Sequence, residues 1–193
     1  MSSSSEKFKS LSKFLSLVLR HNPSAAHISL DPNGWANVND LIAGVTKAGK
    51  KGFSSAVLEE IVASDSKMRY SFNDDHTLIR ANQGHSVSVD LQFQPVQPPS
   101  VLYHGTATRF LSSILESGLI PGSRTHVHLS ADLATATAVG KRHGKPVILI
   151  VNAQEMAAQG IAFYLSANGV WLVDKVPPHF LTVTSEDDAG RAS

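Results

Sequence analysis

Apolar side chains recur at helical spacing in the first 21 residues, after a serine-rich start. Within residues 7–21 they fall at Phe8, Leu11, Leu15 and Val18. A repeat of three to four positions is the period of an amphipathic helix with one buried face. Asn22-Pro23 ends the predicted helix, because a residue that precedes proline disfavours the α region.

Two more helices and a hairpin are predicted before residue 82. The second helix starts at Asn39 or Asp40, and the third covers residues 56–64 behind a capping Ser54 or Ser55. Residues 68–72 and 77–81 flank a polar turn with alternating apolar and polar positions, which predicts a β-hairpin. Three helices followed by a hairpin are the element order of a winged helix.

The second half of the chain has a different pattern. Residues 91–100 contain three prolines and three glutamines, which predicts an extended linker. Strands are predicted at 101–104, 127–130, 146–151, 163–165 and 170–173, and helices at 109–117 and 132–141. We therefore predict an α+β fold with one lobe at 1–90, the linker at 91–100, a second lobe at 101–184 and a disordered tail at 185–193.

Composition excludes several classes of protein. The 193 residues include no cysteine, which excludes disulfides, cysteine-ligated zinc, iron–sulfur clusters and a thiol nucleophile. A hydrophobic fraction of 42% can form packed cores, and no apolar run approaches the ~18 residues of a membrane span. The start lacks the apolar stretch of a secretory signal, so we expect a cytoplasmic protein. A net charge of +1 means that any nucleic acid must be bound by a local cluster.

Two basic residues, Arg20 and His21, end the first predicted helix. Cations at this position would oppose the negative end of the helix dipole without any further role. The pair also suits an oxyanion, because arginine offers a planar fork to phosphate and histidine titrates near neutral pH. Arg69, in the predicted hairpin, is either a solvated edge residue or a third member of that site.

Two segments of the second half carry candidate chemistry. The residues 103–106 (Tyr-His-Gly-Thr) end a predicted strand, where glycine lets the backbone approach a ligand closely. In the strand predicted around residue 127, alternation puts Arg124, His126 and His128 on one face, which is costly unless an anion lies against it. These histidines also suit zinc, but no carboxylate or cysteine is spaced to complete the site.

A series of longer segments recurs in a fixed order along the chain. They are SKFLSLVLRHNP, the GW/LI segment after it, KMRYSF, IRANQGHS, LYHGT, SILESGL, RTHVHLS and SANGVWL. Together they resemble the RNA 2′-phosphotransferase family (KptA, the tRNA 2′-phosphotransferases), from residue 7 to residue 181. The resemblance implies an N-terminal winged-helix lobe that holds RNA and phosphate, and a C-terminal ADP-ribosyltransferase-like β-sheet lobe that binds NAD.

The resemblance also implies the residues of the site. The family's essential Arg-His-Arg-Arg set falls on Arg20, His21, Arg69 and Arg124. Its NAD contacts fall on Tyr103, His104, Gly105, Thr106, His128, Ser130, Asp132, Gly140, Arg142, Phe163 and Ser166. No metal is implied. Residues 166–171 lack the glutamate that many protein-modifying ADP-ribosyltransferases use, which suits a phosphate nucleophile that needs no carboxylate base.

The implied reaction removes an internal 2′-phosphate from RNA in two steps. The phosphate attacks C1″ of the NAD ribose as nicotinamide leaves, and the ribose 2″-OH then attacks phosphorus and expels the RNA 2′-oxygen. The products are 2′-OH RNA, ADP-ribose 1″,2″-cyclic phosphate and nicotinamide. The implied partners are NAD and a tRNA-like RNA with an internal 2′-phosphate, and we expect a monomer with no membrane partner.

Three alternatives remain open at the level of the sequence. A one-step enzyme would ADP-ribosylate a terminal phosphate of RNA or DNA and leave the ADP-ribose attached. A winged-helix regulator would bind nucleic acid and only sense NAD with its second lobe, so it would release no nicotinamide. A histidine metal site is the third alternative, and metal analysis would test it.

Overall fold

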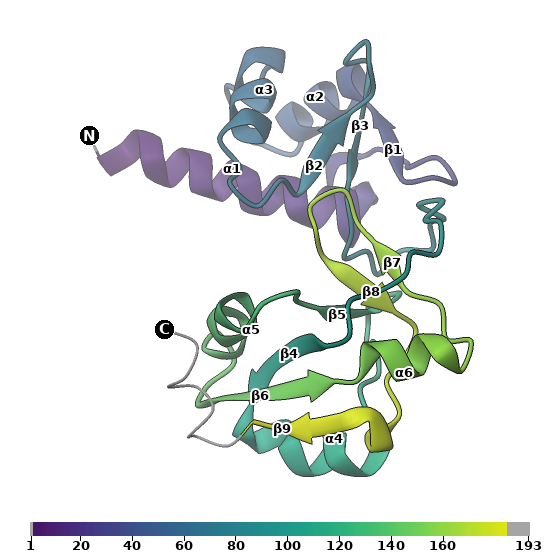
Figure 1. Cartoon of the computed structure of the whole chain (residues 1–193). Helices are drawn as coiled ribbons and strands as arrows, with labels where there is room; N and C mark the ends of the chain where they lie inside the picture. The colour runs from purple at the N-terminus through teal and green to yellow at the C-terminus, as the bar shows by residue number, and fades with distance from the viewer. Residues whose placement is uncertain (1, 185–193) are drawn as a thin grey trace. The chain divides into compact units, whose positions relative to one another are not determined.

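The computed structural model describes residues 2–184 and confirms a mixed α+β fold, with six α-helices and three small antiparallel sheets among those residues (Figure 1). The chain divides into two compact units, Met1–Gln92 and Phe93–Ser193, which are described separately. The lobe boundaries expected from the sequence stay a prediction. The tail predicted at 185–193 lies outside the described residues.

The first unit contains three α-helices and one sheet. Its elements are α1 (Ser2–Arg20), η1 (Pro23–Ala26), β1 (Trp35–Asn37), α2 (Val38–Lys47), α3 (Ser55–Ala63), β2 (Tyr70–Phe72) and β3 (Leu78–Ala81). The sheet has the order β1-β3-β2, with both pairs antiparallel. The predicted hairpin is therefore confirmed as β2 and β3. Strand β1, which the sequence did not predict, pairs with the other edge of β3.

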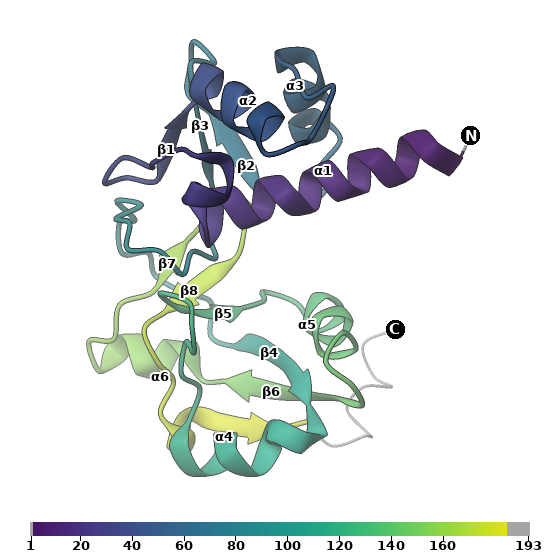
Figure 2. The same cartoon turned by 180° about the vertical axis from the view of Figure 1, so that it is seen from behind.

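Helix boundaries in the first unit follow side-chain caps. The Ser54 hydroxyl accepts a hydrogen bond from the Val57 backbone N–H, so the predicted cap of α3 is confirmed. The predicted start of α2 at Asn39 or Asp40 is one or two residues late, because the helix is capped by the Asn37 side chain, which accepts from both of their backbone N–H groups. Figure 2 shows α1 as the longest helix of the unit, and it begins five residues before the predicted start.

The core of the first unit lies between the helices and one face of the sheet. The buried residues that α1 supplies are Leu11, Leu15, Val18 and Leu19. Gly44 on α2 lets that helix approach η1 closely, since a Cβ at this position would lie 1.8 Å from the Ala26 carbonyl oxygen. This close packing holds the C-terminal end of η1, the short turn that follows α1, against α2.

The second unit contains two small sheets and three α-helices. One sheet has the order β4-β6-β9 and consists of β4 (Leu102–Ala107), β6 (Pro146–Val151) and β9 (Leu181–Val183). The other has the order β5-β8-β7 and consists of β5 (Val127–Leu129), β8 (Trp171–Val173) and β7 (Tyr164–Leu165). The helices are α4 (Leu111–Ser117), α5 (Leu133–Gly140) and α6 (Ala153–Ala158), and two short 3₁₀ turns are η2 (Thr108–Phe110) and η3 (Pro178–Phe180).

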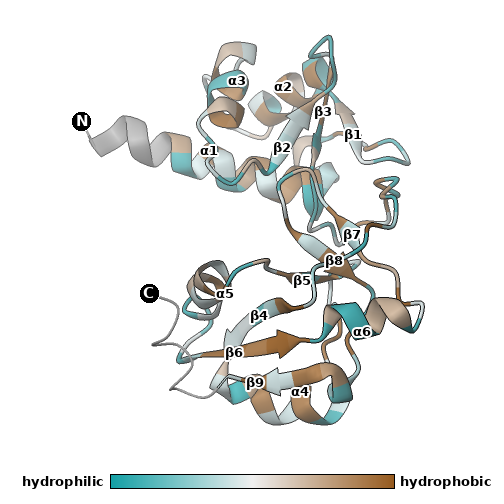
Figure 3. Ribbon diagram, in the orientation of Figure 1, coloured by the Kyte–Doolittle hydropathy of each residue, from teal (hydrophilic) through white to brown (hydrophobic). Residues whose placement is uncertain are grey.

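Strand β6 forms the apolar centre of the first of these sheets, as the hydropathy colours show (Figure 3). Its bounds are those predicted from the run PVILIV. The strands predicted at 163–165 and 170–173 are confirmed as β7 and β8, which pair antiparallel. Helix α6 and strand β9 were not predicted. Among the described residues, no helix is long and apolar enough to cross a membrane.

Candidate active site

The candidate residues at the end of α1 are held by a segment that follows β3. The His21 imidazole Nδ1 lies 2.9 Å from the Ser86 hydroxyl oxygen. The Ser86 backbone N–H also donates to the Arg20 carbonyl oxygen at 2.9 Å, which satisfies a carbonyl that the helix itself leaves open. This Nδ1 contact fixes the orientation of the imidazole ring.

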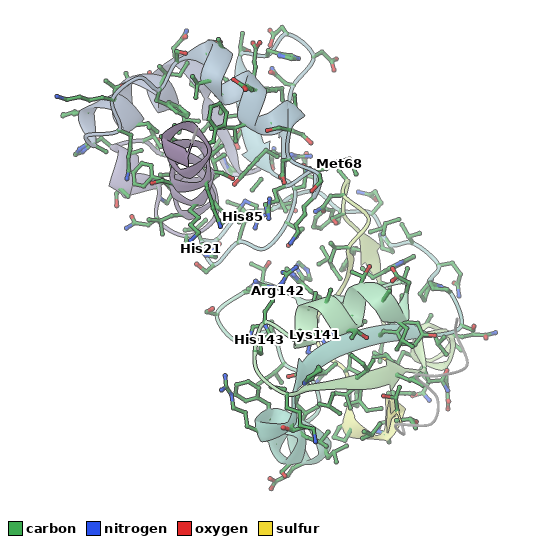
Figure 4. All side chains as sticks on the ribbon, turned by 90° about the vertical axis from the view of Figure 1, so that its left-hand side faces the viewer. His21, Met68, His85, Lys141, Arg142 and His143 are labelled. Carbon is green, nitrogen blue, oxygen red and sulfur yellow. The ribbon has the colours of Figure 1, made fainter. Side chains whose placement is uncertain are left out.

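A second imidazole, His85, is buried beside this pair (Figure 4). Its side chain is 0% exposed, and neither ring nitrogen has a hydrogen-bond partner among the described residues. Burial lowers its pKa to about 4, with smaller contributions from the positive charges of Arg20, His21 and Arg80. His85 is therefore neutral at pH 7 and adds no charge to the site.

Arg69 is the last residue of a tight turn between α3 and β2. The carboxylate of Asp65 accepts hydrogen bonds from the Arg69 backbone N–H, at 2.8 Å, and from the Lys67 backbone N–H, at 3.2 Å. The same carboxylate pairs with the Arg69 guanidinium through Nη1. Met68 has a φ of +42°, in the left-handed region, and its carbonyl oxygen accepts from the Asn82 side chain.

Tyr70 connects the arginine of the turn with the arginine of α1. The Arg20 guanidinium carbon lies 6.0 Å from the Tyr70 ring centroid, and the Tyr70 hydroxyl donates to the Ser12 carbonyl oxygen. Burial raises the pKa of the Tyr70 phenol, while the charges of Arg20 and Arg69 both oppose that rise. The charges of Arg20 and Arg69 therefore both act on Tyr70, and His21 directly follows Arg20 at the end of α1.

The second unit brings together His104, Arg124 and His128. His104 donates from Nδ1 to the His128 carbonyl oxygen at 3.0 Å, since a carbonyl can only accept. Arg124 donates from Nη1 to the His128 Nδ1 at 2.9 Å, since a guanidinium has no acceptor. These bonds fix both tautomers. Nε2 of His104 carries no proton, whereas Nε2 of His128 carries one.

Desolvation lowers the pKa of His104, and the nearby His143 lowers it further, against the opposing effect of its bond to His128. Desolvation also lowers the pKa of Arg124, which still remains a cation. The arrangement offers a guanidinium and two neutral imidazoles in one place. Such a set can bind a polar ligand without the charge repulsion of three cations.

The prediction that Arg124, His126 and His128 share one face of a strand was wrong. Strand β5 covers only Val127–Leu129, so Arg124 and His126 lie before it. Arg124 nevertheless reaches His128, whereas His126 packs edge-on against Tyr164, at 5.7 Å between ring centroids, and lies 3.7 Å from Asp174. Among the described residues, no group of three or more histidine and carboxylate side chains gathers in a metal-binding arrangement.

Four of the other predicted NAD contacts shape the backbone around His104. Tyr103 and Ser130 exchange backbone hydrogen bonds at 2.8 and 2.9 Å, which joins β4 to the end of β5 next to His104. Gly105 lets α5 pack directly on β4, because a Cβ there would lie 1.7 Å from the Ala136 carbonyl oxygen. Gly140 has a similar role, and its Cβ would lie 2.9 Å from the Thr106 carbonyl oxygen.

Three of the predicted contacts have evident structural roles. Asp132 caps α5 by accepting from the Thr135 backbone N–H at 2.7 Å, a bond that lowers the pKa of its carboxyl. Ser166 is 3% exposed and hydrogen-bonds within the β7–β8 turn. Phe163 is 1% exposed and belongs to the hydrophobic core. Arg142 follows α5 in an exposed loop with Lys141 and His143 (Figure 4).

Two residues that hold the site were missed by sequence reasoning. Asp65 had a local signal, since an aspartate that begins a short polar turn commonly accepts from backbone N–H groups ahead of it. Asn82 had none. It is 5% exposed and also donates from its backbone to the Arg69 carbonyl oxygen at 2.8 Å, which only the β2–β3 pairing makes possible. The segment 83–86, which follows β3, supplies the Ser86 contact to His21.

Comparison with known proteins gives one consistent family. The family model described as RNA 2′-phosphotransferase, Tpt1 / KptA family, matches residues 6–175. A probable RNA 2′-phosphotransferase of Hahella chejuensis is 54% identical over 185 residues, which cover 96% of this chain and 99% of the relative. One from Escherichia coli is 55% identical over 171 residues, or 88% of this chain and 92% of the relative. One from Acaryochloris marina is 50% identical over 175 residues, or 91% and 96%.

Proposed function

Because the chain belongs to the RNA 2′-phosphotransferase, Tpt1 / KptA family, we propose that it removes an internal 2′-phosphate from RNA with NAD as the co-substrate. The observation that carries this proposal is the family match over residues 6–175, together with the presence of all four of the implied residues Arg20, His21, Arg69 and Arg124. The position of Arg20 and Arg69 around Tyr70 in the first unit supports it further.

The first unit, in this proposal, is a winged-helix lobe that holds the 2′-phosphate. Its three helices and its three-stranded antiparallel sheet support that assignment. A 2′-phosphate carries between about −1.5 and −2 charges near pH 7. Arg20 and Arg69 would bind its oxygens as charge-assisted donors, and His21 would add a titratable donor whose ring orientation Ser86 fixes.

The second unit, in this proposal, is an ADP-ribosyltransferase-like lobe that binds NAD. NAD supplies an electrophilic ribose carbon, C1″, with nicotinamide as the leaving group. The bare Nε2 of His104 suits a donor on the dinucleotide, and the Nε2–H of His128 suits an acceptor. The contacts assigned to Asp132, Phe163 and Ser166 remain the least supported, because those side chains already serve the cap, the core and a turn.

The first step forms a bond between a 2′-phosphate oxygen and C1″, and breaks the C1″–nitrogen bond to nicotinamide. A phosphate oxygen is already an anionic nucleophile, so no carboxylate base is required. The transition state is cation-like at C1″, and its rate depends mainly on how well the two reactants are positioned. Arg20, His21 and Arg69 would position the phosphate.

The second step forms a bond between the ribose 2″-oxygen and phosphorus, and breaks the bond from phosphorus to the RNA 2′-oxygen. Negative charge grows on the phosphoryl oxygens, and Arg124 is the guanidinium assigned to stabilise it. The proton lost by the 2″-OH ends on the RNA 2′-oxygen. His21 is the group assigned to carry it, because an imidazole both accepts and donates a proton near neutral pH and Ser86 fixes the orientation of the ring.

A single incubation tests this proposal. Purified protein is mixed with NAD and a short RNA that carries one internal 2′-phosphate, without added metal, and both sets of products are followed. We expect 2′-OH RNA, ADP-ribose 1″,2″-cyclic phosphate and nicotinamide in equal amounts. Accumulation of ADP-ribosylated RNA alone would instead indicate the one-step enzyme, and an absence of nicotinamide release would indicate a regulator that only binds NAD.

A further inference from the structure

A crevice lies in the first unit, next to Arg69, on the side where α1 meets the turn after α3. Its volume is about 230 Å³. Phe8 and Ile61 form an apolar part of its lining, and the polar residues that line it are Lys9, Ser12, Ser64, Asp65, Ser66 and Arg69. The proposed function assigns a role only to Arg69, so the rest of the crevice is so far unexplained.

The crevice is suited to an anion. The Asp65 carboxylate, 5% exposed, is already covered by three N–H donors: two backbone groups and the Arg69 guanidinium. Its charge is thus offset within the turn, which leaves the exposed Lys9 ammonium as the dominant charge at the opening. Ser12 and Ser66 add hydroxyl donors, whereas the Ser64 hydroxyl is used by the Glu60 carbonyl oxygen at 2.6 Å.

The position of the crevice is fixed by the same contacts that fix the candidate site. The Tyr70 hydroxyl bonds to the Ser12 carbonyl oxygen, which ties β2 to α1 at the wall of the crevice. Asp65 fixes Arg69 at the opposite wall. Since Arg69 lines the crevice and is also one of the residues assigned to the 2′-phosphate, a ligand in the crevice would lie beside a phosphate held by Arg69.

We propose that this crevice binds a backbone phosphate of the RNA strand, next to the nucleotide that carries the 2′-phosphate. The inference rests on the proposed function, because it assumes an RNA substrate at Arg69. A volume of about 230 Å³ is below that of ordinary ligand pockets and suits one phosphate with part of its ribose. Lysine and hydroxyl groups are the usual contacts to nucleic-acid phosphates, and such contacts position a strand without reading its sequence.

The test compares two RNAs, each with one internal 2′-phosphate. One is a dinucleotide, which lacks the additional backbone phosphates, and the other has three more nucleotides on each side. The variants are Lys9→Ala and Ser66→Ala. Lys51→Ala is the matched control, because Lys51 is an exposed lysine of the same unit that does not line the crevice. Thermal unfolding of each variant checks that the fold is retained.

We expect Lys9→Ala to raise the KM of the longer RNA about three- to tenfold and to leave the KM of the dinucleotide nearly unchanged. The kcat of both RNAs should stay the same. The slope of log kcat/KM against log salt for the longer RNA should become shallower by about 0.7, the value for one lost phosphate contact to a single strand. Ser66→Ala should act in the same direction but more weakly, and Lys51→Ala should not separate the two RNAs.

Two results would overturn the inference while leaving the proposed function intact. One is an equal effect of Lys9→Ala and Lys51→Ala on the longer RNA, which would mean that only the overall positive charge of the unit matters and not a contact in the crevice. The other is an equal effect of Lys9→Ala on both RNAs. Failure of the proposed function looks different, because the unsubstituted protein would then release no phosphate from either RNA.

Discussion

The His21 imidazole and the Ser86 hydroxyl, 65 positions apart in the chain, lie 2.9 Å from each other. A backbone bond from Ser86 to the Arg20 carbonyl reinforces the contact. The end of α1 is therefore clamped by the segment that leaves β3. This clamp holds a histidine ring in one orientation at an exposed position, where it would otherwise rotate freely.

Removal of the Ser86 hydroxyl tests the clamp. We expect Ser86→Ala to lower kcat about tenfold with little change in KM, because the His21 ring is no longer fixed for proton transfer. Ser86→Thr keeps a hydroxyl at the same place and should recover most of the activity. Ser88→Ala, at an exposed serine two positions later, is the control. Equal activity of the Ser86→Ala and Ser86→Thr variants would show that the hydroxyl has no positioning role.

Truncation of Arg69 tests the phosphate site of the first unit. We expect Arg69→Ala to lower phosphate removal at least about a hundredfold, because a charge-assisted contact to the reacting phosphate is lost. Binding of NAD, followed by calorimetry, should persist. Arg109→Ala removes an exposed arginine that stacks on Phe110 in the second unit, and it should stay close to the unsubstituted rate. Activity of Arg69→Ala within a few-fold of the unsubstituted protein would refute the assignment.

Truncation of Arg124 separates the two steps. We expect Arg124→Ala to slow the second step more than the first, because the lost guanidinium is the one assigned to the phosphoryl charge of transesterification. ADP-ribosylated RNA should then accumulate in a single-turnover experiment. Arg124→Ala also removes the donor to His128, so His128→Ala is measured beside it. A proportional loss of both steps in Arg124→Ala would leave its role in the second step without support.

The buried His85 predicts a dependence of stability on pH. The unfolded chain binds a proton at this residue below about pH 6.5, whereas burial keeps the folded residue neutral down to about pH 4. Above pH 6.5 the residue is neutral in both states and does not lower the free energy of unfolding. As the pH falls from 6.5 toward 4, only the unfolded state binds the proton, so the free energy of unfolding decreases. By linkage, the loss amounts to about 3 kcal/mol of the free energy of unfolding.

Urea unfolding from pH 4 to pH 8 measures this dependence. His85→Leu replaces the imidazole by an apolar side chain of similar size, so its free energy of unfolding should fall less steeply with acid than that of the unsubstituted protein. The carboxyl groups and the other histidines titrate in both proteins and cancel in the comparison. Parallel curves for the two proteins would mean that His85 does not carry the effect.

The local elements of this protein follow from short stretches of its sequence. The run PVILIV predicted β6 to the residue, Ser54 predicted the start of α3, and alternation around a polar turn predicted the β2–β3 hairpin. These features depend on the period of the backbone and on caps within four residues, so a single stretch of chain contains the information. The family resemblance, carried by collinear segments, likewise needed no structure.

The hydrogen bonds that hold the candidate residues join segments far apart in the chain and are seen only in the tertiary structure. Ser86 meets His21 only because β3 returns beside α1, and Asn82 reaches Met68 only through the register of β2 and β3. Strand β9 has three residues and takes its form from pairing with β6, so its own sequence carries little signal. Contacts between distant segments depend on packing of the whole unit, and the spacing of residues along the chain does not contain them.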